Sequence, residues 1–431
     1  MESSHVIILL LLLGGMAAYV PVFMCLFFTG LLGFLFFTDL PLLLLTQTLF
    51  RSLDNFALVV VLFFILCGNI MTTGTIVEKI IKVANALVSW LPGGLGMAGV
   101  IACALFGAIS GSTVATVVAL GGFMIPALLE KGYPMNYTVG LMTTSGNLGI
   151  IIPPSISMIL YCMISNVSLE GLFLTGYVPG ILITILICIY TFFVFRNSTT
   201  VKRQAVPNSA EMWAIFKEGI WSLGLPIVIF VGIFSGAFTA NEAAVVACIY
   251  AFVVELFIHR TMTLSQVKKV TVSSAVTSAT LLIIVAGASC FGRLLTLENI
   301  PAKITEAVMG TIQSPWVFLM VMNLLLFVVG MFMDVISATL ILGPVFLPML
   351  AAFHIDPMHF GLLMTVNLAI GYCTPPVGVS LYITGAMVNK DLIFVTKACA
   401  PFLAIQIGVL MLMTYVPDVV LWLPRLWGYA Q

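Results

Sequence analysis

Two Pro-Pro pairs stand inside apolar sequence, each just after glycines and residues with side-chain oxygens. The first belongs to the stretch GIIIPPS at residues 149–155, and the second to GYCTPPV at residues 371–377. Proline donates no backbone hydrogen bond and disfavours helical geometry in the residue before it, so a helix that reaches either pair must break. Carbonyl groups freed by such a break, with serine, threonine and asparagine oxygens nearby, are the ligands that a bare sodium ion needs. A simple proline kink is the alternative interpretation.

Two further interruptions carry hydroxyl groups or a carboxylate. Residues 107–113 separate the apolar runs 97–106 and 114–129. Each run is short for a full crossing of the membrane when the other run has to cross as well. We therefore interpret the interruption as the tip of a helical hairpin that enters the membrane and turns back. A close-packed helix crossing through small residues is the alternative. Residues 330–337 place Asp334 in an apolar run, where a carboxylate is costly and indicates a cation site or a helix cap.

The four interruptions are two copies of one plan. The two Pro-Pro stretches are separated by 371 − 149 = 222 residues, and Pro92 matches Pro315 at an offset of 223. We therefore expect a first repeat at 1–200, a cytoplasmic linker at 201–217 and a second repeat at 218–431. Their hairpins are expected at about 95–130 and 316–352, and their broken helices at about 136–165 and 358–388. Related halves in membrane proteins are parallel or inverted around a site near the midplane.

The amino-acid composition indicates that these elements lie in a membrane. The 431 residues are 61% hydrophobic and 7% charged, which excludes a water-soluble fold. Roughly eleven apolar runs are long enough to cross a bilayer, so we expect an all-α polytopic membrane protein. The first run, residues 6–37, lacks a basic start and a cleavage site, and is expected to be a retained helix. The nine cysteines and four histidines are scattered without metal-ligand spacing, and the balanced charge gives no reason to expect nucleic acid as a partner.

Basic residues indicate the orientation. The most polar stretch carries Arg196, Lys202, Arg203 and Lys217, and the positive-inside rule places it in the cytoplasm. A second basic loop, residues 259–269, lies on the same side only if residues 218–258 cross twice or re-enter.

Other charged residues in apolar sequence are expected to have structural roles. Arg293 could meet a substrate carboxylate or pair with Glu242 or Glu298, and we favour a structural or interfacial role. Glu78 lies on a segment that is amphipathic at helical spacing, which is typical of a helix in the membrane interface.

At these motifs the chain resembles the large membrane subunit, the M subunit, of the tripartite ATP-independent periplasmic (TRAP) transporters. The likeness spans nearly the whole chain and rests on six motifs in order: LPGG at 91–94, ISGS at 109–112, IIPPS at 151–155, FT with EAA at 238–244, GMFMD at 330–334, and NLAIG running into TPPVG at 367–378. The resemblance implies inverted repeats with two re-entrant hairpins and two discontinuous helices, working as an elevator in the bacterial inner membrane. It also implies sodium coupling, a small four-helix membrane subunit (Q) and a periplasmic substrate-binding protein (P).

Site residues follow from the resemblance by position. The first sodium site would comprise Ser110, Thr113, Gly149, Ile152 and Pro154. The second would comprise Met333, Asp334, Ser337, Gly371, Thr374 and Pro376. The substrate region would include Ser112, Ser145, Asn147, Ser155 and Asn367. The sequence SGN at 145–147 departs from the commoner family pattern, which bears on the substrate and not on the fold.

The expected function is sodium-coupled uptake of a small organic anion, with no cofactor and no metal other than sodium as coupling ion. C4-dicarboxylates are the first choice, followed by sialic or other sugar acids and 2-oxo acids. An ion gradient would supply the energy, since the chain has no Walker-type phosphate loop. A membrane-embedded enzyme would need a nucleophile with a partnered base, and no His or Asp lies at plausible spacing from a serine. Paired hairpins suit alternating access better than a channel, whereas a similar carrier that needs no binding protein is a close alternative.

Overall fold

Every regular element in the described part of the chain is a helix. The computed structural model describes residues 3–429 except 19, 39–40, 202 and 204. The first half contains α1 Ser3–Ala17, α2 Val22–Phe37, α3 Leu42–Leu53, α4 Ala57–Thr73, α5 Ile76–Val88, α6 Gly94–Ser110, α7 Thr113–Thr116, η1 Val117–Gly121, α8 Gly122–Glu130, α9 Met135–Ser145, α10 Leu148–Ile151, α11 Ile156–Ser165 and α12 Leu169–Phe195. The second half contains α13 Ser209–Phe234, α14 Ala240–Val253, η2 Val254–Ile258, α15 Leu264–Leu297, α16 Ile300–Thr311, α17 Pro315–Phe332, α18 Val335–Ala352, α19 Pro357–Gly371, α20 Val379–Val388, α21 Leu392–Tyr415 and α22 Asp418–Leu426.

The expected polytopic membrane architecture is confirmed, although with fewer full-length spans than roughly eleven. Within the described residues, nine helical stretches are long and apolar enough to cross a membrane, or ten if α3 and α4, bent by 52°, form one span. The run at residues 6–37 is wrong as a single helix, because it divides into α1 and α2. Pro21 caps α2 in an extended conformation (φ −53°, ψ 136°) and cannot continue the preceding helix.

Three of the four expected hairpin arms are themselves long enough to cross, so length alone does not make them re-entrant. These are residues 113–130, 315–332 and 335–352, each 18 residues long. Contacts at the tips, described below, bear on their depth.

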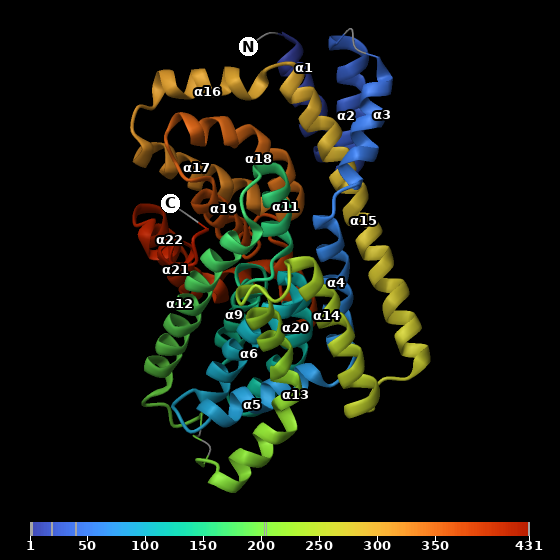
Figure 1. Ribbon diagram of the computed structural model, residues 1–431. Helices are drawn as coiled ribbons and strands as arrows, with labels where there is room; N and C mark the ends of the chain where they lie inside the picture. Colours follow the sequence, from blue (N-terminus) through green and yellow to red (C-terminus); the bar gives the residue numbers. More distant parts are fainter. Residues whose placement is uncertain (1–2, 19, 39–40, 202, 204, 430–431) are drawn as a thin grey trace.

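The two basic connections lie at one end of the molecule. Helix α13 begins at Ser209, inside the segment expected as linker, because Asn208 and Glu211 form a capping box there. α13 runs away from that end, and α14 with η2 returns to it (Figure 1). The segment between Glu218 and Ile258 therefore belongs to two antiparallel candidate spans, which is the path that a double crossing would take. Lys202 lies outside the described residues.

Two short helices lie transverse to the long ones at opposite ends of the molecule. α5 crosses one end and α16 the other (Figure 1), and their first residues are 300 − 76 = 224 positions apart. α5 buries Ile76 and Ile80, while Glu78 and Lys82 on its outer face form an ion pair of 3.1 Å. This arrangement agrees with the interfacial helix expected from the amphipathic sequence.

Candidate functional site

The first hairpin tip is a sharp turn at Gly111. Helix α6 ends at Ser110, and Gly111 takes the left-handed conformation (φ +60°), which an L side chain rarely adopts. Ser112 then caps the next helix, because its Oγ accepts the Ala115 N–H at 3.4 Å. The helix that starts there continues from Thr113 through a π-helical turn to Glu130.

This tip rests directly on the first broken helix. A Cβ on Gly107 would lie 2.9 Å from the Cα of Gly149, and the Ile156 N–H donates to the Gly111 carbonyl at 3.5 Å. The break follows α10 at the cis Pro153-Pro154 peptide and ends where α11 begins. It lies near the centre of the 31-residue apolar stretch Met135–Ser165, so the tip reaches the middle of a span rather than its end.

The second tip and break repeat this contact. A Cβ on Gly330 would lie 3.2 Å from the Cα of Gly371. These two glycines correspond to Gly107 and Gly149 of the first pair, at offsets of 223 and 222 residues. The N–H groups of Val377 and Gly378 both donate to the Met331 carbonyl at 3.2 Å. The Pro375-Pro376 peptide is also cis. The two halves thus place a tip on a break by the same close approach of backbone to backbone.

Asp334 begins the second arm of this hairpin. Its Oδ2 accepts the Ser337 N–H at 2.9 Å, which caps α18. The Tyr372 hydroxyl, from the break, accepts the Val335 N–H at 2.9 Å. Capping was one of two roles expected for this carboxylate, and a cation ligand is the other.

Buried oxygens without a protein hydrogen-bond partner stand at both breaks. In the first half they are Thr113 Oγ1 on the tip and Ser145 Oγ at the end of α9. In the second half Ser337 Oγ and Asn367 Oδ1 correspond to them, at offsets of 337 − 113 = 224 and 367 − 145 = 222, and Thr339 Oγ1 and Ser380 Oγ near the second break are unpartnered as well. An unsatisfied buried polar atom is destabilising, and a bound ion is one explanation for it. Neutral oxygens beside opened backbone are a donor set that fits sodium.

The remaining predicted sodium ligands lie in the same two regions, with different exposure. At the first break Ile152 and Pro154 are buried, and Ser110 Oγ lies 3.3 Å from the hydroxyl of Thr116. The second break is more open, because Pro376 is exposed while Met333 and Thr374 are half-buried. The Thr374 hydroxyl donates to the Ile370 carbonyl at 3.1 Å.

A cavity of about 680 Å³ opens beside the first tip. It lies between that tip, α4 and α15, and Ile336 of the second tip also lines it. Its polar lining consists of Asn69, Thr72, Ser110, Ser112 and Thr277. The cavity therefore joins both tips to two long helices outside the hairpins.

Of the predicted substrate residues, Ser112 lines this cavity. The other four, which are Ser145, Asn147, Ser155 and Asn367, are fully buried and lie outside its lining. Asn69, Thr72 and Thr277 were not predicted as site residues. Asn69 and Thr72 could have been found as polar residues of the otherwise apolar α4, whereas Thr277 stands among other serines and threonines of α15 and gives no such signal.

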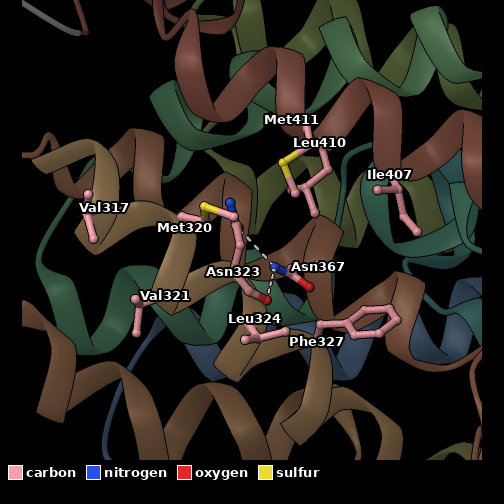
Figure 2. Close-up of a pocket in the computed structure, with 10 residues that line it drawn as sticks. All are labelled: Val317, Met320, Val321, Asn323, Leu324, Phe327, Asn367, Ile407, Leu410 and Met411. Atoms are coloured by element: carbon pink, nitrogen blue, oxygen red, sulfur yellow. Dashed lines mark hydrogen bonds between the residues drawn. The ribbon is translucent and has the colours of Figure 1, made fainter.

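Asn367 instead belongs to a buried amide cluster on the second half. Its Nδ2 donates to both the backbone oxygen and Oδ1 of Asn323 at 2.9 Å, and Asn323 Nδ2 donates to the Thr414 hydroxyl at 2.9 Å. Figure 2 shows the pair at a separate pocket of about 370 Å³, whose other lining residues are apolar and come from α17 and α21. Because the accessible lining is almost entirely apolar, this pocket does not suit an anionic substrate.

Glu242, in the first turn of α14, belongs to a capping box with Thr239. Its Oε2 accepts the backbone N–H of Thr239 at 2.8 Å and the Thr239 hydroxyl at 2.9 Å, which starts α14. Arg293 is exposed on α15. The capping box accounts for the carboxylate without Arg293.

Comparison with known proteins gives a consistent result. The family described as "Tripartite ATP-independent periplasmic transporter, DctM component" matches residues 7–419. The chain is 38% identical to a C4-dicarboxylate TRAP transporter large permease protein of Rhodobacter capsulatus, over 99% of this chain and all of that protein. It is 32% identical to a 2,3-diketo-L-gulonate TRAP transporter large permease protein of Escherichia coli, over 96% of this chain and 97% of that protein. Among solved structures, the YdaH transporter of Alcanivorax borkumensis shares the fold, with a TM-score of 0.64 at 15% identity over 90% of each chain.

Proposed function

The chain belongs to the DctM family of TRAP transporter large subunits, multi-pass proteins of the bacterial inner membrane that are permeases and not enzymes, and from this premise we propose that it couples sodium entry to uptake of a small organic anion. The observation that carries the proposal is the matched set of unpartnered oxygens at the two breaks. If these oxygens needed only a hydrogen-bond partner, a protein group would be expected to supply one in at least one of the two sites. Two equivalent sites that both present free oxygens are better explained by ions that occupy both.

Each sodium site would combine one hydroxyl from a tip with one side-chain oxygen and carbonyl groups from a broken helix. Thr113 and Ser145 supply the side-chain oxygens of the first site, and Ser337 and Asn367 those of the second. Sodium would hold each tip against its break and so stabilise the closed arrangement of the hairpins. Each sodium that enters adds about 2.3 kcal/mol per 100 mV of membrane potential to the driving force.

The substrate would bind in the 680 Å³ cavity beside the first tip. Its described polar lining is made of hydroxyl and amide groups, and the helix that begins at Thr113 points its N-terminal N–H groups toward the tip, which favours an anion there. A C4-dicarboxylate is the first candidate because the Rhodobacter relative is named for that class. A sugar acid is the second, after the name of the Escherichia relative, and a 2-oxo acid is also possible on chemical grounds.

We propose further that the halves are inverted and that the hairpins move with the broken helices as an elevator. The placement of α5 and α16 at opposite ends supports inversion, because the two helices are equivalent by sequence offset (Figure 1). The basic end that holds α5 would face the cytoplasm. Re-entrant hairpins are supported by the tips' contact with the middle of a broken span.

Two partners complete the proposal. TRAP large permeases work with a small membrane subunit and a periplasmic binding protein, and this chain would do the same. The small subunit would add helices to the stationary part, and the binding protein would deliver the anion to the end opposite the basic loops.

Reconstituted vesicles test the function. The chain is purified with its small subunit, and uptake of labelled succinate is measured with an inward sodium gradient and the cognate binding protein outside. We expect uptake that disappears when potassium replaces sodium or when the binding protein is omitted. Equal uptake in potassium would overturn sodium coupling, whereas sodium-dependent uptake without the binding protein would establish the second candidate, a carrier that works alone.

A further inference from the structure

A chain of buried hydrogen bonds joins the two broken helices to each other and to α21. Cys373, at the second break, donates from Sγ to Asn147 Oδ1 at 3.5 Å, and Asn147 lies between α9 and α10 at the first break. Asn147 Nδ2 donates to Gln406 Oε1 at 2.9 Å, and Gln406 Nε2 donates to the Thr144 carbonyl at 2.9 Å. All four residues have no exposed surface.

The direction of this chain is determined at one end. A backbone carbonyl only accepts, so Gln406 must turn its NH₂ group toward Thr144 and its oxygen toward Asn147. Asn147 must then donate to Gln406 and present its Oδ1 to the Cys373 thiol, for which the Thr143 carbonyl oxygen, 3.7 Å from Sγ, is a second acceptor. Each amide has one acceptable orientation, and the bridge is therefore specific in geometry as well as in contact.

Both ends of the chain adjoin candidate cation ligands. Thr144 precedes Ser145, whose hydroxyl is unpartnered at the first site. Cys373 precedes Thr374, which the sequence assigns to the second site. A shift of either break that accompanies ion binding would have to move or break the amide bridge, and residues with no exposed surface have no contact with bulk solvent that could replace a lost bond.

We propose that Asn147 and Gln406 are positioning residues that couple the two cation sites, so that sodium bound at one break favours the geometry that binds sodium at the other. The inference rests on the sodium coupling proposed above. It predicts cooperative sodium binding, with a Hill coefficient that approaches the number of coupled sites, about 2. It also gives Asn147, which was expected to contact the substrate, a different role.

Sodium titration of the purified protein tests the coupling without transport. The thermal midpoint is followed as sodium replaces choline at constant ionic strength, because a ligand that binds only the folded protein raises it. Four variants are compared: Asn147→Leu, Cys373→Ala, Cys373→Ser and Cys103→Ala. Cys103 is a matched control, since it is a buried thiol in α6 that makes none of the bridge's hydrogen bonds. The serine variant retains a donor for Asn147.

We expect a Hill coefficient near 2 for the wild type, for Cys103→Ala and for Cys373→Ser, and near 1 for Asn147→Leu and Cys373→Ala. A purely structural bridge would lower the midpoint in the absence of sodium while leaving the Hill coefficient unchanged, and that result would overturn the inference. So would a wild-type Hill coefficient of 1. Absence of any sodium-dependent rise in the wild type would instead refute the proposed function, and with it this inference.

Discussion

A single methyl group at Gly149 should separate the first tip from its break. A Cβ there would lie 2.6 Å from the Ser112 carbonyl oxygen and would also collide with the Thr116 hydroxyl. Ordinary contact starts at 3.4 Å, so the tip would have to retreat by 3.4 − 2.6 = 0.8 Å. Rotation of the Thr116 side chain would relieve the contact with its hydroxyl but not the 3.0 Å contact with its Cβ, and the Ser112 backbone cannot move without the whole tip. Overpacking of this kind costs about 1–3 kcal/mol.

That cost falls on the ion-bound state if sodium holds the tip against the break. At about 1.4 kcal/mol per factor of ten, Gly149→Ala should weaken apparent sodium affinity by roughly 5- to 150-fold. The assay is the sodium dependence of uptake in reconstituted vesicles, with Gly408→Ala on α21 as control, because a Cβ on Gly408 meets nothing within 4 Å. If Gly149→Ala kept the sodium dependence of the control while remaining folded, the closed tip would not be the sodium-bound state.

Two further perturbations test the roles of Asp334 and His259. Asp334→Asn retains an acceptor for the Ser337 N–H, so its thermal midpoint in choline should match the wild type, whereas Asp334→Ala should lose about 1 kcal/mol of stability. Sodium affinity lowered in both variants identifies a cation ligand, and wild-type affinity in Asp334→Asn leaves only the cap. Burial, and then the nearby Lys79 ammonium, lower the pKa of His259 at the basic end, against the opposing effects of Glu255 and Glu218. Its contribution to stability is therefore present above pH of about 6.5 and is lost as pH falls through the lowered pKa, so the fall in thermal midpoint between pH 8 and pH 5 should be smaller in His259→Gln.

Backbone chemistry made much of the fold and part of the site predictable. The Pro-Pro pairs and glycines limit the backbone whatever surrounds them, so the interruptions at 149–155 and 371–377 could be identified and matched by offset. The family resemblance, carried by the same motifs, is confirmed. Hydropathy predicted the membrane class but not the division of residues 6–37. Both helices are apolar, so hydropathy does not change at the boundary, and only Pro21 indicates it.

Contacts between distant segments were not predictable from local pattern. Asn147 and Gln406 are 259 residues apart, and nothing in the spacing of polar residues indicates that they meet. The same holds for Asn69 and Thr277, which reach one cavity from different helices. Asn69 is visible as a polar residue in the apolar α4, whereas Thr277 lies among other hydroxyl residues, and the cavity that they share depends on how α4 and α15 pack against the tip.

The comparison of the two halves shows which features a shared site demands. Where backbone meets backbone, the same residue recurs: Gly107 and Gly149 in one half, Gly330 and Gly371 in the other, since any side chain would force the segments apart. Where only a side-chain oxygen is required, the residue type differs between the two halves. Threonine on the first tip corresponds to Ser337 on the second, and the serine at the end of α9 corresponds to asparagine on α19. Selection for packing alone would not retain an unpartnered oxygen at both places while changing the side chain that carries it. A requirement for an oxygen atom directed at an ion would do so, because sodium distinguishes distance and charge but not whether a hydroxyl or an amide supplies the ligand.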